Sequence, residues 1–188
     1  MIAIHAIKVL VLVSIPLLFN ALNRSNADDT YQLIESRNGI EIRQYRESVF
    51  ASYSNSQDNS SNFSELAEYI FGGNEKRQMI EMTSPVRSNM YGKKEMLFLM
   101  PETVTIENYP APNNERVKII QTPARLTASI AFSGYADDLT CGKMKLELID
   151  ILTQNSMGYE NDFQTLIYDP PYKRVGRLNE ILVSIKNN

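Results

Sequence analysis

The sequence predicts an α+β domain in which a curled antiparallel sheet is flanked by two helices. Most segments of residues 28–188 are short, alternate apolar with polar side chains and end at turn residues, which is typical of strands. Two segments instead place apolar residues at helical spacing. The order strand, helix, strand, strand occurs twice, at an offset of about 80 residues. This order predicts two similar halves and an internal repeat.

The expected strands lie at residues 31–35, 40–45, 49–54, 78–87, 95–100, 117–121, 126–132, 163–168 and 180–185. The first helix is expected over residues 63–70, with Asn62 and Glu65 as a capping box and Gly72-Gly73 as the stop. The second helix is expected to begin near Asp137-Asp138.

The first 27 residues have the layout of a signal peptide. A weakly basic start precedes the apolar run 9–19, which is too short to span a bilayer comfortably as a helix. Ser25 and Ala27 are small residues at the positions that a signal peptidase requires. We therefore expect a signal peptide over residues 1–27 and a mature domain over residues 28–188, exported to the periplasm or secreted. The alternative is an uncleaved segment that tethers the domain to a membrane.

Composition limits the classes of partner. The formal net charge is −3, and removal of Lys8 and Arg24 with residues 1–27 leaves about −5. A mildly acidic surface argues against nucleic acid, and no later segment is apolar enough to cross a membrane. Cys141 is the only cysteine, so the chain has no intramolecular disulfide. We expect a monomer stabilised by packing.

The sequence offers little for catalysis. The only histidine is His5, within the segment that we expect to be removed. The mature domain then lacks the usual general base, the usual zinc ligand and the partner of a Ser or Cys nucleophile. We interpret Asp137-Asp138 as stabilising a helix start, and Cys141 as a buried inert thiol, although a helix N-terminus can lower a thiol pKa. We expect no catalytic residue and no enzymatic activity.

Several methionines gather after the first helix, at positions 79, 82, 90, 96 and 100. Methionine side chains are polarisable and adaptable, so they suit either a core or a surface that receives a flat apolar ligand. In the second case, the first helix and the methionine-rich segment would form an exposed apolar patch.

Five short motifs follow one another along the chain: Tyr69-Ile70-x-Gly72-x-Asn74, Met82-Thr83-Ser84-Pro85-Val86, Pro110-Ala111-Pro112, Phe132-Ser133-Gly134 and Tyr168-Asp169-Pro170-Pro171. Together, in this order, they resemble the SOUL family of heme-binding proteins over about residues 30–186. The resemblance implies a distorted eight-stranded antiparallel β-barrel flanked by two α-helices and built from two similar halves. Our reading of the repeated element order agrees with this.

The resemblance also implies binding of heme or another porphyrin at a shallow hydrophobic surface near the first helix. The corresponding residues here are Phe63, Leu66, Ala67, Ile70 and Phe71, with Met79 and Met82. Some family members use a histidine as iron ligand, but none follows His5, so no iron ligand is singled out. Three basic residues are candidates to pair with heme carboxylates, with a solvated loop as their alternative role: Lys173, Arg174 and Arg177.

We therefore expect a non-enzymatic carrier, buffer or scavenger of heme or related tetrapyrroles outside the cytoplasm. Apolar contact at about 25 cal/mol per Å² can supply such binding without iron ligation. The alternative is a module for other bulky hydrophobic ligands, because paired strand-helix-strand-strand units also resemble bacterial effector-binding domains.

Overall fold

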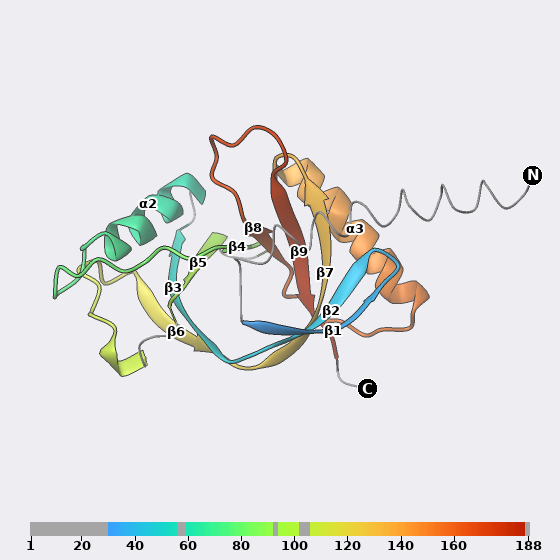
Figure 1. Cartoon of the computed structure of the whole chain (residues 1–188), viewed down its shortest axis with the longest axis horizontal. Coiled ribbons are helices and arrows are strands. Elements are labelled where there is room, and N and C mark those ends of the chain that lie inside the picture. The colour runs from blue at the N-terminus through green and yellow to red at the C-terminus, as the bar shows by residue number, and fades with distance from the viewer. Residues whose placement is uncertain (1–29, 56–58, 92–93, 102–105, 187–188) are drawn as a thin grey trace, which may run out of the picture.

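The computed structural model describes residues 30–55, 59–91, 94–101 and 106–186 (Figure 1). The predicted signal peptide, residues 1–27, lies outside the described residues. Within the described ranges, no helix has both the length and the apolar character to cross a membrane.

One antiparallel sheet and two α-helices make up the fold, which confirms the predicted α+β class. The strands are β1 (Tyr31–Arg37), β2 (Ile40–Tyr45), β3 (Ser48–Asn55), β4 (Val86–Asn89), β5 (Lys94–Leu99), β6 (Lys118–Thr122), β7 (Arg125–Ser133), β8 (Gln164–Ile167) and β9 (Leu178–Ser184). The helices are α2 (Asn59–Ile70) and α3 (Asp138–Gln154), with a short 3-10 turn, η1 (Ile106–Asn108). The sheet has nine strands, one more than the eight that the resemblance implied.

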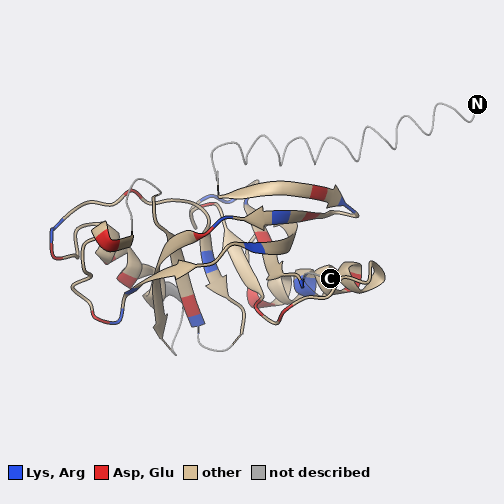
Figure 2. Cartoon of the chain, turned by 90° about the horizontal axis from the view of Figure 1, so that it is seen from below, with Lys and Arg blue, Asp and Glu red and all other residues tan. Residues whose placement is uncertain are grey.

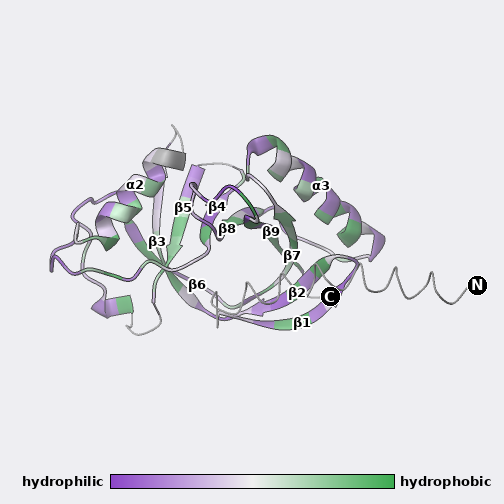
Figure 3. Cartoon of the chain, turned by 45° about the horizontal axis from the view of Figure 1, so that its top comes forward, coloured by the Kyte–Doolittle hydropathy of each residue, from purple (hydrophilic) through white to green (hydrophobic). Residues whose placement is uncertain are grey.

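The strand order is β1-β2-β7-β9-β8-β4-β5-β3-β6. Its central six strands comprise β3, β4 and β5 from the first half and β7, β8 and β9 from the second, and the halves meet where β4 pairs with β8. Each half has the predicted order strand, helix, strand, strand. The sheet curls so that α2 and α3 lie on its outer side, at opposite ends of the molecule (Figures 1 and 3). An origin by duplication stays a prediction.

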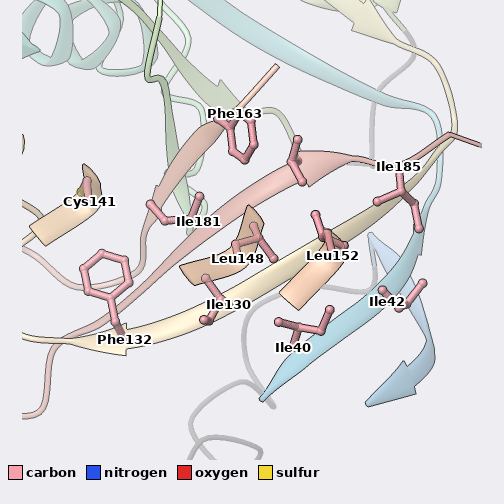
Figure 4. Close-up of a cluster of buried hydrophobic side chains, with 12 residues drawn as sticks. Ile40, Ile42, Ile130, Phe132, Cys141, Leu148, Leu152, Phe163, Ile181 and Ile185 are labelled. Atoms are coloured by element: carbon pink, nitrogen blue, oxygen red, sulfur yellow. The ribbon is translucent and has the colours of Figure 1, made fainter. Parts of the chain in front are cut away.

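Each helix covers its own apolar core on the outer side of the sheet. α2 lies against β3 and β5, where Leu66, Tyr69 and Ile70 are buried with Ala51, Phe98 and other side chains. α3 lies against β7 and β9, and Leu148 and Leu152 are central to its cluster (Figure 4). Each fully buried Leu or Ile stabilises the fold by about 1.5–3 kcal/mol. These two cores attach the helices to the sheet.

The opposite face of the curled sheet, which we call the inner face, is much more polar. Side chains alternate between faces along a strand, so Ile42 lies in the α3 core while the neighbouring Arg43 points inward. Arg43, Arg87 and Glu180 are all buried there. Tyr45 and Phe50 add aromatic surface to the same face.

Two local predictions were wrong. The segment 78–87 was expected to be a strand, but β4 begins only at Val86 and Met79 forms an isolated bridge. Pro85 has no backbone N–H to donate to a neighbouring strand, which is consistent with the late start of β4.

Asn62 was expected to cap the first helix, but α2 already begins at Asn59. The Asn62 side chain is buried and donates a hydrogen bond to the carbonyl of Lys94 at 2.7 Å, so it joins α2 to β5.

The predicted start of α3 is confirmed. Asp137 has extended backbone angles and its carboxylate accepts a hydrogen bond from the amide of Thr140 at 2.8 Å. This bond lowers the pKa of Asp137, as expected for a carboxylate that stabilises free N–H groups at a helix start.

Gly142 and Gly73 give a matched pair of stability predictions. A Cβ at Gly142, inside α3, would meet no atom within 4 Å, so Gly142→Ala is expected to stabilise the protein by about 0.5–1 kcal/mol. A Cβ at Gly73 would lie 2.6 Å from the Glu68 carbonyl oxygen, so Gly73→Ala is expected to destabilise it by about 1–3 kcal/mol. Urea unfolding of both variants measures this. Equal effects of the two substitutions would contradict the packing around Gly73.

Candidate functional site

The residues predicted for the heme surface fall into two groups. Leu66 and Ile70 are buried in the core beneath α2, so they position the helix and cannot contact a ligand without its displacement. Ala67 is half-buried. The exposed large side chains are Phe63 (38%), Phe71 (57%), Met79 (65%) and Met82 (42%), and we call these four the α2 patch.

Phe71 and Met79 form the centre of the α2 patch. They face each other across an isolated antiparallel bridge immediately after the end of α2. The amide of Ile80 also donates a hydrogen bond to the carbonyl of Ile70 at 2.8 Å. Phe63 lies eight residues before Phe71, about 12 Å along the helix axis at 1.5 Å per residue. Its ring packs edge-on against Phe98 of β5, with centroids 5.3 Å apart.

A buried asparagine organises the turn that joins Phe71 to Met79. The Asn74 side chain donates hydrogen bonds to the carbonyls of Tyr69 and Gln78 at 3.0 and 2.8 Å, and accepts one from the Gln78 amide at 3.0 Å. Gly72 has a φ of +100°, a conformation that glycine adopts without strain. The motif Tyr69-Ile70-x-Gly72-x-Asn74 therefore closes this turn and aligns Phe71 with Met79.

Two exposed cations in the same turn, Lys76 and Arg77, were missed in the sequence analysis. α2 itself contains Glu65 and Glu68 but no basic residue, so the cations lie beyond its C-terminal end (Figure 2). The available signal was a basic pair placed between the helix stop at Gly72-Gly73 and the exposed Met79. The patch thus has an apolar centre and a charged edge, where the exposed Lys76 and Arg77 follow the exposed Glu75.

The three basic residues predicted from the loop after β8 have different surroundings. Arg177 is buried and donates hydrogen bonds to the carbonyls of Pro170 and Lys173 at 2.9 and 3.2 Å. Lys173 forms an ion pair with Asp169 at 2.7 Å. Arg174 is exposed. Arg177 and Lys173 therefore stabilise their own loop, and Arg174 is the one most accessible to a ligand carboxylate.

Asp169 anchors the base of this loop. Its carboxylate accepts hydrogen bonds from Lys173 and from the amide of Leu178, both at 2.7 Å. Burial opposes ionisation of Asp169, but these bonds outweigh it and lower the pKa. Asp169 is therefore ionised at neutral pH.

Cys141 lies in the first turn of α3 and is buried. Burial raises the pKa of its thiol, so the reactive thiolate is scarce at neutral pH. This agrees with the prediction of an inert cysteine.

We expect native Cys141 to react with iodoacetamide at pH 7.5 at least about tenfold more slowly than the same residue in denaturant, because the native thiol is buried and protonated. Mass spectrometry of quenched samples measures both rates. Similar rates in the two states would contradict the buried position.

A separate cavity of about 320 Å³ opens at the turn between β2 and β3. It is lined by Arg46, Glu47, Ser48, Val49, Leu99, Met100, Pro101, Tyr109 and Gln121. None of the residues predicted to contact heme lines it. Among the described residues, no group of three or more His, Cys, Asp or Glu side chains is arranged to hold a metal ion.

Comparison with known proteins decides the family. The family described as SOUL heme-binding protein matches residues 27–184. The chain belongs to this family. Membership supports heme binding, and SOUL proteins are generally binding proteins.

Individual relatives of this SOUL protein agree with the family assignment. Heme-binding protein 1 of Xenopus laevis is 28% identical over 131 residues, which cover 65% of this chain and 68% of the relative. Heme-binding protein 2 of Homo sapiens is 31% identical over 136 residues, which cover 66% of this chain and 65% of the relative. The chain therefore matches about two thirds of the length of these relatives.

A solved structure, the C-terminal domain of EcmrR, has a similar fold. It superposes with a TM-score of 0.59, covering 84% of this chain and 99% of that domain. The sequences are only 13% identical, so this likeness concerns the fold alone.

Proposed function

We propose that this SOUL protein binds heme or a related tetrapyrrole at the α2 patch, without catalysing a reaction on it. The observation that supports this most directly is the exposed pair Phe71 and Met79, held side by side by a bridge in a member of a heme-binding family. Neither side chain is part of the buried core, so packing of the fold does not explain their exposed apolar surface.

Apolar contact supplies a large part of the binding free energy. Burying roughly 300 Å² of apolar patch and ring surface supplies about 7 kcal/mol at 25 cal/mol per Å², before the cost of association. The patch residues are attached to an ordered turn, so little side-chain and backbone ordering is needed on binding. The surroundings therefore fit a flat, largely apolar ligand.

The charged edge of the patch suits the carboxylates of such a ligand. Lys76 and Arg77 are exposed in the turn between Phe71 and Met79, and we propose that they pair with heme propionates. Heme would bring an iron centre, for which no residue is assigned as ligand. The thioethers of Met79 and Met82 are the sulfur groups within the patch.

Titration of the purified protein with hemin and with iron-free protoporphyrin IX tests the proposal. We expect saturable absorbance changes below about 10 µM with both compounds, because ring contact is the main contribution. Saturation with hemin alone would instead indicate an iron ligand. The absence of saturable change with both would overturn the proposal, and preference for unrelated hydrophobic compounds would favour the effector-binding alternative.

Charge variants test the edge of the patch. Lys76→Gln combined with Arg77→Gln is expected to weaken hemin binding several-fold, because each lost ion pair at an exposed site contributes up to about 1 kcal/mol. Arg116→Gln combined with Lys118→Gln is the matched control, since both of these residues are also exposed. Equal losses in the two double variants would indicate a general charge effect.

We further propose that the domain acts as a heme carrier, buffer or scavenger outside the cytoplasm. The support is the signal-peptide layout of residues 1–27 and a family match that begins at residue 27. The intact mass of protein recovered from an exporting host tests the cleavage. A chain that begins at Asp28 is expected, whereas a full-length chain in the membrane fraction would favour the tethered alternative.

A further inference from the structure

The inner face of the sheet contains three arginines, and two of them have acidic partners. Arg43 donates two hydrogen bonds to Glu180, at 2.6 and 2.8 Å, and one to Glu41 at 2.9 Å. Arg125 forms an ion pair with Asp162 at 2.9 Å. Arg43 and Arg125 are thus neutralised within the fold.

Arg87 of β4 is the third arginine, and its environment is different. Its side chain is only 3% exposed, and its Nε and Nη2 atoms are buried without a hydrogen-bond partner. Its guanidinium lies over the rings of Tyr45 and Phe50, at 4.7 and 4.8 Å from their centroids. In the part of the chain that the structure describes, no ion pair includes Arg87.

The nearest acidic side chain along the paired strand is already engaged elsewhere. Arg87 pairs in register with Leu97 of β5, and Glu95 is two residues away on the same face. The Glu95 carboxylate accepts hydrogen bonds from Ser52 at 2.5 Å and from Asn89 at 2.7 Å. Among the described residues no acidic side chain therefore forms an ion pair with Arg87, and Glu180, two strands away on the same face, is bound to Arg43.

The charge of Arg87 also affects its neighbour Arg125. Burial lowers the pKa of Arg125, and the proximity of Arg87 lowers it further. The charge of Asp162 opposes this effect. An anion next to Arg87 would relieve the repulsion between the two arginines.

We propose that Arg87 binds a carboxylate on the inner face of the sheet, through parallel hydrogen bonds from Nε and Nη2. These two atoms form one edge of the planar guanidinium, and that edge matches the two oxygens of a carboxylate. The guanidinium carbon lies 4.7 and 4.8 Å from the ring centroids of Tyr45 and Phe50, so the rings stabilise the charge while Nε and Nη2 stay without a hydrogen-bond partner. The site is separate from the α2 patch and does not depend on the function proposed there.

Two sources of the carboxylate are possible: a free small organic acid, or the acidic group of a larger ligand. Sodium acetate is a suitable probe for both, because it contains little besides the carboxylate. Sodium chloride at matched ionic strength provides the comparison, since a single spherical ion cannot bridge both nitrogens in the same way. If acetate binds without competing with hemin, the site receives a separate acid. Competition that is lost in Arg87→Met would instead show that the carboxylate belongs to hemin, and hemin would then lie on the inner face rather than at the α2 patch.

Thermal unfolding of the full chain at pH 7 with increasing acetate tests the proposal. Acetate at about ten times its dissociation constant is expected to raise the Tm by about 3–6 °C beyond the effect of chloride. In Arg87→Met, which keeps the side-chain length but removes the donors, the acetate-specific rise is expected to disappear. Arg116→Met is the matched control, because exposed Arg116 also lies over a tyrosine ring, Tyr53, at 5.0 Å.

Arg87→Lys provides a second variant if Arg87→Met does not fold. Lysine keeps the positive charge but cannot form two parallel hydrogen bonds, so we expect at least about tenfold weaker acetate binding. Isotope-labelled acetate followed by NMR line broadening measures this affinity directly. Equal effects of acetate and chloride on the native chain, or an acetate-specific effect that survives in both Arg87 variants, would overturn the proposal.

Discussion

Replacing Phe71 and Met79 together by alanine is expected to weaken hemin binding by roughly 30-fold or more. Both side chains are largely exposed, so their truncation removes contact surface for a ligand. A loss of about 1 kcal/mol from each residue amounts to about 2 kcal/mol, and each 1.4 kcal/mol is a factor of ten in affinity. The fold should change little, because neither residue belongs to the core beneath α2.

Absorbance titration with hemin measures this loss, and urea unfolding checks that the variant is folded. The matched control is Leu139→Ala combined with Leu146→Ala, which truncates two exposed leucines on α3 (85% and 65% exposed). The control variant is expected to bind hemin normally. Unchanged binding in the Phe71 and Met79 variant, or an equal loss in the control, would move the site away from the α2 patch.

Glu180→Gln is expected to destabilise the protein by about 3 kcal/mol, because it leaves a buried arginine with only the more exposed Glu41 as a counter-charge. The side chains of Arg43 and Glu180 are both fully buried, and two hydrogen bonds join them. Burial alone would lower the pKa of Arg43, but the charge of Glu180, its hydrogen bond and the nearby Tyr45 and Tyr168 together outweigh it and raise the pKa. Tyr168 also donates a hydrogen bond to Glu180 at 3.1 Å.

Urea unfolding of two further variants separates the pair from its surroundings. Glu41→Gln removes the more exposed partner of Arg43 and is expected to cost no more than about 1 kcal/mol. Arg43→Met combined with Glu180→Met removes both charges and is expected to be more stable than Glu180→Gln. Equal stabilities of Glu180→Gln and the native protein would show that the charged pair does not matter for folding.

The local pattern of apolar and polar residues in the sequence was sufficient to predict the class of fold. Alternating strands, two amphipathic segments and the repeated element order predicted the two halves, and Asp137 correctly marked the start of α3. The first helix was placed too late, because Asn62 resembles a cap but is buried against β5. A sequence does not reveal that a polar side chain will find a distant backbone partner.

The polar inner face could not be predicted for a similar reason. Arg43 and Glu180 are separated by 137 positions, and alternation along a strand does not show which face the curled sheet encloses. Arg87 reads in the sequence as an ordinary charged residue of a strand. Its burial follows only from the way the strands curl around it.

Four of the seven residues predicted for the heme surface are exposed to solvent: Phe63, Phe71, Met79 and Met82. The helical spacing of Leu66 and Ile70 marks the stripe that packs on the sheet, so these residues are core. The exposed contribution comes from residues outside the stripe, Phe71 and Met79, which meet because Asn74 closes the turn between them. Contact across a turn of this kind depends on tertiary geometry.

The most direct test of the central claim is NMR mapping of hemin on the labelled protein. Paramagnetic ferric heme broadens the signals of nearby nuclei, and diamagnetic zinc protoporphyrin serves as the reference. We predict selective broadening for the methyl groups of Met79 and Met82 and the amides of residues 71–80. Signals of α3, including Leu148 and Leu152, should remain sharp. Broadening centred on α3 or on the cavity beside Tyr109, with sharp Met79 and Met82 signals, would contradict heme binding at the α2 patch.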